Sequence, residues 1–121
     1  MLQHISIELP SEAADAAVEF FGLLGFEPVE APAEIAPYVT WVEREGTQFH
    51  FILTDAESAT VPTLGHAAVV VAEFEATLAK LREGGYPVEE ARRLWGERRA
   101  FTIGPGGHRV ELMAAPPPRS R

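Results

Sequence analysis

Hydrophobic positions along the chain follow two periods, one typical of β-strands and one typical of amphipathic helices. Residues 2–9 alternate apolar and polar side chains, which predicts a strand that ends at Pro10. Residues 11–24 place apolar side chains three and four positions apart, which predicts a helix with one buried side. We expect Ser11 to cap the N-terminus of this helix and Gly25 to end it.

Three further strands are predicted in the first half of the chain. They cover residues 26–31, 38–44 and 47–53. Prolines surround the first of these strands, which favours an edge position in the sheet. Glu45 and Gly46 join the other two, and a short connection that contains glycine indicates a hairpin. A polar, proline-containing linker at residues 54–63 follows the hairpin.

The same order of elements then repeats. One strand, one helix and three strands are predicted at residues 64–71, 73–83, 86–91, 99–103 and 108–113. The repeat is also visible in the residues, since GFEPVE at 25–30 returns as GYPVE at 85–89. Phe74, Leu78 and Leu81 are expected on the buried side of the second helix. Each half is therefore predicted to be a βαβββ module.

These patterns predict a single α+β domain over residues 1–114. It consists of two tandem βαβββ modules, residues 1–53 and 64–114, with a flexible tail at 115–121. Each module would form one small, curved, mixed sheet. Because neither sheet can bury its concave face alone, we expect the two modules to enclose a cleft.

Composition and charge exclude several classes of function. The formal net charge is −8, and so acidic a surface repels the phosphate backbone of nucleic acids. The chain has no cysteine, which excludes a disulfide framework and thiolate metal ligands. No apolar run approaches the ~20 residues of a membrane span, and the first residues lack the pattern of a secretory signal. We expect a cytoplasmic protein that binds neither nucleic acid nor membranes.

Four side chains with metal-binding chemistry occur as two similar pairs. His4 and His50 form the first pair, His66 and Glu111 form the second, and the two separations agree to within one residue. Imidazole and carboxylate groups are good ligands for a borderline divalent cation. Duplication of one module would explain why four ligands fall into two pairs. A metal centre is therefore the leading hypothesis for the candidate site.

The strand pattern places these side chains on faces away from their apolar neighbours. His50 lies between two phenylalanines, and Glu111 lies between Val110 and Leu112, so each points to the face opposite those residues. A carboxylate within an apolar strand needs a partner, and a cation is one candidate. The alternative for the histidines is a hydrogen bond across the sheet. The remaining histidine, His108, is expected to be solvated beside a turn, and the face that Trp41 occupies is left open.

Four segments of the chain resemble the vicinal oxygen chelate superfamily. They are His4 in the first strand, QFHF at 48–51, GHAAV at 65–69 and GGHRVEL at 106–112. The superfamily includes glyoxalase I, methylmalonyl-CoA epimerase, extradiol dioxygenases, fosfomycin-resistance transferases and bleomycin-binding proteins. The resemblance covers residues 1 to about 114. It implies a glyoxalase-like fold whose ligands come from the first and last strands of each module, here His4, His50, His66 and Glu111.

The resemblance implies a function but leaves the reaction open. A divalent ion (Zn, Ni, Fe or Mn) would polarise a carbonyl of a small oxygen-chelating substrate and stabilise an enediolate-type intermediate, with Glu111 as the base. Such a protein is a lyase or an isomerase. The same ligands suit an Fe(II) extradiol-type dioxygenase, and the superfamily also contains non-catalytic drug-binding proteins. Many relatives build their sites between subunits, so a homodimer is expected.

A short basic segment offers a second candidate feature. Four of the ten basic residues are Arg92, Arg93, Arg98 and Arg99, and Trp95 lies between them. One interpretation is a clamp for an anionic substrate, with Trp95 as a stacking wall and Arg98 and Arg99 as contacts. The other is a solvated loop whose charges balance neighbouring glutamates. The sequence does not decide between them.

Overall fold

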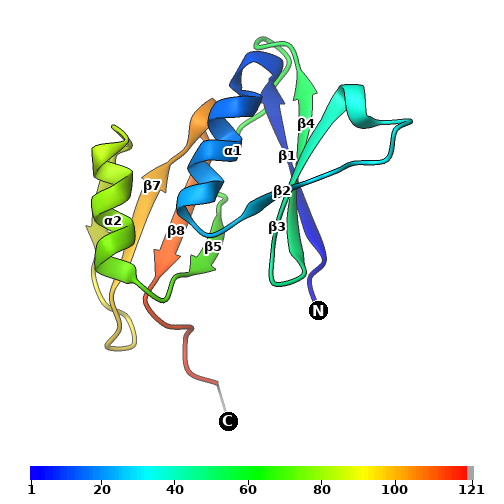
Figure 1. Ribbon diagram of the computed structural model, residues 1–121. Helices are drawn as coiled ribbons and strands as arrows, with labels where there is room; N and C mark the ends of the chain where they lie inside the picture. Colours follow the sequence, from blue (N-terminus) through cyan, green and yellow to red (C-terminus); the bar gives the residue numbers. More distant parts are fainter. Residues whose placement is uncertain (120–121) are drawn as a thin grey trace. The chain divides into compact units, whose positions relative to one another are not determined.

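The computed structural model describes residues 1–119 and divides the chain into two compact units, Met1–Val61 and Pro62–Arg121 (Figure 1). The boundary between the units falls inside the linker predicted at residues 54–63. The last two residues of the tail predicted at 115–121 lie outside the described residues. Within the described part of the chain, no helix combines the length and apolar character needed to cross a membrane.

The first unit is a four-stranded mixed sheet with one helix (Figure 1). Its elements are β1 (His4–Pro10), η1 (Ser11–Ala13), α1 (Ala14–Leu23), β2 (Glu27–Val29), η2 (Ala36–Tyr38), β3 (Val39–Arg44) and β4 (Thr47–Thr54). The strand order is β1-β4-β3-β2; β1 runs parallel to β4, and the other neighbours are antiparallel. The short β2 lies at the edge, as the surrounding prolines predicted.

Aromatic side chains hold α1 on this sheet. The Phe21 ring of α1 lies 4.5 Å from the Phe49 ring and 5.4 Å from the Phe51 ring of β4, measured between centroids. The prediction that Ser11 caps the helix was wrong. Ser11 begins a 3₁₀ turn instead, and its hydroxyl donates to the carbonyl oxygen of Thr54 at 3.4 Å, so it is not available to the helix amides.

The second unit repeats this topology. Its elements are β5 (Ala67–Val70), α2 (Phe74–Glu83), β6 (Val88–Ala91), β7 (Arg99–Ile103), η3 (Pro105–Gly107) and β8 (Arg109–Met113). The strand order is β5-β8-β7-β6, with β5 parallel to β8. Phe74, Leu78 and Leu81 are buried, as their spacing predicted. The predicted α+β architecture of two βαβββ modules is confirmed.

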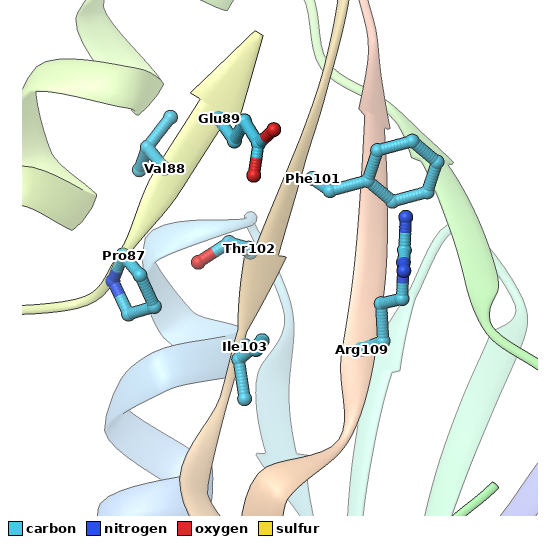
Figure 2. A pocket seen from close by; sticks show the side chains of 7 residues that line it. All are labelled: Pro87, Val88, Glu89, Phe101, Thr102, Ile103 and Arg109. Atoms are coloured by element: carbon cyan, nitrogen blue, oxygen red, sulfur yellow. The ribbon is translucent and has the colours of Figure 1, made fainter. Parts of the chain in front are cut away.

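Strand alternation gives each sheet a core face and an opposite face, here called the distal face. In the first unit α1 covers the face of Phe49 and Phe51, so His50 and its register partner Trp41 lie on the distal face. In the second unit Phe101 and Arg109 project from the same, distal side of β7 and β8 (Figure 2). The face of Trp41, which the sequence left open, is therefore the face of the candidate ligand His50.

His108 is a correction to the sequence analysis. We expected a solvated side chain, but only 8% of His108 is exposed. The reason is the alternation of side chains along a strand. His108 directly precedes β8, and its side chain lies on the same face as the core residues Val110 and Leu112. The turn before it uses Gly106 and Gly107 at φ values of 79° and 86°, a conformation that favours glycine.

Candidate functional site

Three rings stack on the distal face of the first unit. Trp41 and His50 have centroids 4.0 Å apart and planes 7° apart, and His50 and His4 have centroids 4.0 Å apart and planes 13° apart. The rings come from the adjacent strands β3, β4 and β1. The first predicted ligand pair is therefore brought into direct contact, and Trp41, which sequence reasoning did not assign, is stacked against it.

Hydrogen bonds orient both histidines of this stack. His4 Nδ1 lies 2.7 Å from Gln3 Oε1, and His50 Nε2 lies 2.7 Å from Gln48 Oε1. Gln48 Nε2 donates in turn to Glu43 Oε1 at 2.8 Å, which turns the amide oxygen of Gln48 toward His50. Because an amide oxygen only accepts, His50 Nε2 carries the hydrogen and His50 Nδ1 keeps the lone pair.

The stacked rings are not arranged as two ligands of one ion. A histidine binds a metal in the plane of its ring, and two nearly parallel rings do not point at one position. One ring must rotate before both can bind. The pKa of His50 is lowered from its ordinary value, first by burial and second by the neighbouring His4. The neutral imidazole, which is the form that binds metals, is thereby favoured.

This lowered pKa gives a testable pH dependence. As the pH falls, the unfolded chain binds a proton at His50 before the folded chain does, so His50 contributes stability above about pH 6.5 that is lost at lower pH. We expect His50 to titrate below 6.5 in an NMR titration and His4→Ala to raise that value. Glu45→Gln, which changes an exposed charge in the same unit, serves as the control. Titration of His50 above 6.5, or no response to His4→Ala, would contradict this.

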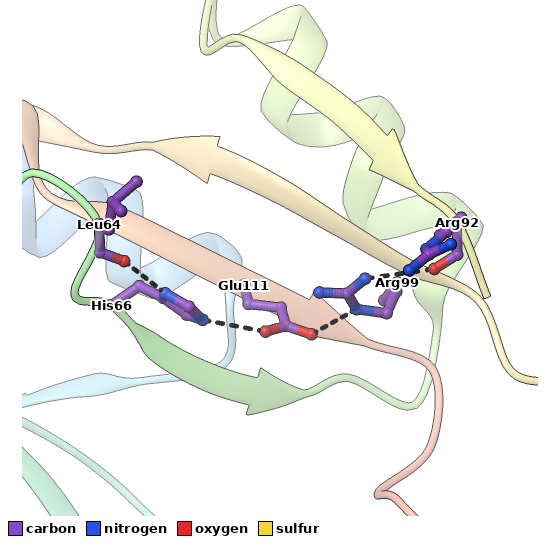
Figure 3. Close-up of polar contacts among 5 residues, drawn as sticks. All are labelled: Leu64, His66, Arg92, Arg99 and Glu111. Atoms are coloured by element: carbon purple, nitrogen blue, oxygen red, sulfur yellow. Dashed lines mark hydrogen bonds and ion pairs between the residues drawn. The ribbon is translucent and has the colours of Figure 1, made fainter. Parts of the chain in front are cut away.

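The second predicted pair is joined directly in the second unit (Figure 3). His66 Nε2 lies 3.1 Å from Glu111 Oε1, and His66 Nδ1 lies 2.9 Å from the carbonyl oxygen of Leu64. Arg99 Nε donates to the other carboxylate oxygen, Glu111 Oε2, at 2.9 Å, and Arg99 Nη1 donates to the carbonyl oxygen of Arg92 at 3.2 Å. Figure 3 shows these contacts as one continuous row along the distal face.

Burial makes the contacts of Glu111 energetically important. The Glu111 side chain is 9% exposed and the Arg99 side chain 13% exposed, so little water is left to solvate either charge. A buried carboxylate is stable only when its oxygens are bonded. Both oxygens of Glu111 have a partner, and Arg99 fixes the plane of the carboxylate.

His66 lies between two hydrogen-bond acceptors. The Leu64 carbonyl can only accept, so His66 Nδ1 carries a hydrogen. A neutral imidazole has no second hydrogen, and its Nε2 lone pair then faces the acceptor Glu111 Oε1. That contact is favourable only when one of the two atoms carries a proton or when both atoms bind one metal ion. The two groups therefore lie where they can share a proton or a metal ion.

Each unit brings together two of the four predicted ligands. The described residues 1–119 contain no cluster of three or more histidine, aspartate or glutamate side chains arranged to hold an ion. Structural and catalytic sites use three or four protein ligands. Each predicted pair therefore has fewer ligands than such a site needs.

The basic segment is divided between different contacts. Arg98 is bonded to Glu75 of α2 and Glu90 of β6, so its charge is already engaged by two carboxylates. Arg99 points instead to the distal face, where its guanidinium lies 6.0 Å from the Trp95 ring. The proposed roles of Trp95, Arg98 and Arg99 as substrate contacts stay predictions. The contacts of Arg98 favour a structural role, and those of Arg99 place it beside the candidate ligand Glu111.

Phe101 and Arg109 were not among the candidates from the sequence. Phe101 presents its ring to His66 edge to face, with centroids 5.1 Å apart, and the Arg109 guanidinium lies 4.0 Å from the Phe101 centroid. Alternation could have identified both residues, because Arg109 is two positions before Glu111 and Phe101 is two positions after Arg99.

Comparison with known proteins agrees with the two-module fold. The family model for the Glyoxalase/Bleomycin resistance protein/Dioxygenase superfamily matches residues 2–112, so the chain belongs to this superfamily. The family resemblance found in the sequence is thereby confirmed. A search of curated proteins found no match.

Several solved structures share the fold. A protein assigned to the glyoxalase family from Bacillus anthracis has a TM-score of 0.82 at 20% identity, over 93% of each chain. The oxidase ChaP-H2 has a TM-score of 0.73 at 22% identity, over 97% of this chain and 94% of its own. The fosfomycin resistance protein FosX from Listeria monocytogenes has a TM-score of 0.74 at 16% identity, over 96% and 93%. Identities this low establish the fold alone.

Proposed function

We propose that this protein is a metal-dependent lyase or isomerase that acts on a small, oxygen-chelating substrate. The proposed metal ligands are His4, His50, His66 and Glu111. One observation carries the proposal: His66 Nε2 lies 3.1 Å from an oxygen of the buried Glu111 side chain. Two acceptors at this separation can bind one ion at about 2.0–2.2 Å each.

The surrounding contacts suit a metal ligand pair. Leu64 holds the tautomer of His66 by accepting from Nδ1, and Arg99 orients Glu111 through Oε2. Partners of this kind commonly fix metal-bound histidines and carboxylates. The lowered pKa of His50 keeps that imidazole neutral and ready to bind, once its ring leaves the stack with His4.

The proposed chemistry divides between the ion and the chain. A bound divalent ion would polarise a substrate carbonyl and so acidify the neighbouring C–H bond. Glu111 Oε1, the oxygen that Arg99 does not hold, would have to be released from the ion to accept the proton. Arg99 would keep the carboxylate pointed at that proton, because its bond to Oε2 survives the transfer. Burial of Glu111 limits competition from water.

A second candidate function rests on the donor set. Two histidines and one carboxylate are the usual ligands of Fe(II) oxygenases, and this chain has such a combination. An extradiol-type dioxygenase would require both Fe(II) and O₂. The stack of Trp41 on His50 would suit a third function, the non-catalytic binding of a planar drug.

The proposed functions differ in the metal ion and in the O₂ that they require, so one experiment can distinguish them. The purified protein is loaded with Zn²⁺, Ni²⁺, Mn²⁺ or Fe²⁺, and hydroxyacetone is incubated with it in D₂O under nitrogen. We expect uptake of one ion per site. We also expect metal-dependent deuterium exchange at the carbon next to the carbonyl, which NMR measures. Cleavage of catechol only with Fe²⁺ and O₂ would support the dioxygenase instead. Absence of metal uptake would overturn both enzymatic proposals.

Subunit arrangement and location belong to the same proposal. The superfamily resemblance predicts a homodimer, which light scattering at micromolar concentration can check. The cytoplasmic location likewise stays a prediction.

A further inference from the structure

The second unit contains a hollow of about 340 Å³ on β6, β7 and β8 (Figure 2). Glu89, Phe101, Ile103 and Arg109 are among the residues that line it. Thr102 also borders the hollow, but its hydroxyl points to the side opposite Phe101 and Arg109 (Figure 2). The polar side chains on the distal side are therefore one cation, Arg109, and one carboxylate, Glu89.

Arg109 differs from its neighbouring arginines in its hydrogen bonding. Arg98 is bonded to two carboxylates and Arg99 to one, whereas the Nε of Arg109 has no hydrogen-bond partner among the described residues. Its Nε is buried, and its guanidinium lies over the Phe101 ring at 4.0 Å. A buried N–H group without a hydrogen bond is unfavourable, and an anion that accepts from it would remove that cost.

Position connects this cation with the proposed metal ligands. Arg109 and Glu111 lie two residues apart on the same face of β8, which separates their Cα atoms by about 6–7 Å. Phe101 lies between the two regions, since its ring contacts both Arg109 and His66. A molecule held at His66 and Glu111 would extend across the Phe101 ring to reach Arg109.

We propose that Arg109 binds the carboxylate of the substrate and so determines its class. The substrate would be a small carboxylic acid whose chelating oxygens and carboxylate are far enough apart to span the Phe101 ring. A guanidinium fork matches the planar carboxylate with two parallel hydrogen bonds. Glu89, which is the register partner of Phe101, opposes a second negative charge, so a monoanionic carboxylate is favoured over a phosphate dianion.

The substrate class rests on the proposed function, but carboxylate binding at Arg109 does not require the metal. The test therefore uses metal-free protein in EDTA. The Nε–H signal of Arg109 is followed by NMR while butyrate, its neutral amide butyramide, or inorganic phosphate is added. We expect a saturable shift with butyrate, none with butyramide, and weaker binding of phosphate. Added salt should weaken the butyrate response through screening.

Variants assign the effect to this side chain. Arg109→Gln should weaken butyrate binding roughly tenfold or more, read from the Phe101 ring signals, because it removes a charge-assisted hydrogen-bond donor. Arg82→Gln removes an exposed charge from α2 in the same unit and should leave binding unchanged. Should Arg109→Gln fail to fold, Arg109→Lys keeps the charge but loses the fork, and it should bind butyrate more weakly than wild type.

Three outcomes would overturn the proposal: equal shifts with butyrate and butyramide, unchanged butyrate binding in Arg109→Gln, or an equal loss in Arg82→Gln. The proposed function fails in a different way. Butyrate binding without any metal uptake would reject the metal-dependent enzyme and leave the carboxylate site. Metal uptake without butyrate binding would reject the carboxylate site and leave the metal-dependent enzyme.

Discussion

Replacing Glu111 by Gln is expected to abolish the stabilisation of the protein by divalent metal ions. The substitution keeps the shape of the side chain but removes the negative charge that balances a cation. An ion present at 100 times its dissociation constant stabilises the wild type by about 2.7 kcal/mol. In Glu111→Gln this increment should vanish, together with metal-dependent turnover. Thermal unfolding with and without Zn²⁺ or Ni²⁺ measures the difference.

The metal-free state of this variant provides an internal check. The new amide can accept from Arg99 through its oxygen and donate to the lone pair of His66 through its nitrogen, so both contacts of Glu111 keep a partner. We therefore expect the melting temperature in EDTA to change much less than the metal response. Glu83→Gln, at the exposed end of α2, is the matched control. An undiminished metal response in Glu111→Gln would remove this residue from the ligand set.

Replacing Arg99 by Gln is expected to destabilise the protein by roughly 3–5 kcal/mol, because it leaves a buried carboxylate without its cation. For a domain of this size the melting temperature should fall by roughly 10 °C or more. The adjacent Arg98→Gln is a close control. Its partners Glu75 and Glu90 are 70% and 43% exposed, and exposed ion pairs contribute only about 0–1 kcal/mol.

This comparison decides between the two interpretations of the basic segment. A large loss of stability in Arg99→Gln alone would assign Arg99 to the orientation of Glu111. Equal stability of the two variants, with a raised KM for an anionic substrate, would favour the substrate clamp instead. Denaturant unfolding at low and high salt provides the measurement, since a buried pair is screened much less than an exposed one.

The faces and the pairing of the candidate ligands were predictable because they depend on local pattern and on repetition. Alternation in a strand assigns Glu111 to the face opposite Val110 and Leu112, and the structure has it there. In both units the first strand pairs in parallel with the last. Residues in or directly before those two strands, such as Glu111 in β8 and His66 before β5, therefore meet within each module.

Errors and omissions arose where contacts come from elsewhere in the fold. Ser11 has the right residue type for a helix cap, yet its hydroxyl bonds to the end of β4. His108 adjoins a turn, yet it points to the core side of its strand and is buried. The residues next to Ser11 in the sequence do not include its partner in β4, and the residues next to His108 do not show what covers it.

By itself the sequence determined the repeat, the strands and helices, the superfamily and the faces on which the candidate ligands lie. The elements and the faces follow from local periodicity, the repeat follows from the recurrence of that pattern, and the superfamily follows from the resemblance of four segments. Only the tertiary structure decided which side chains are partners: the stack of Trp41 on His50, the bond from Arg99 to Glu111, and the Arg109 guanidinium over Phe101. Partners of this kind depend on strand register and on side-chain rotamers, and the alternation of residues along one strand specifies neither.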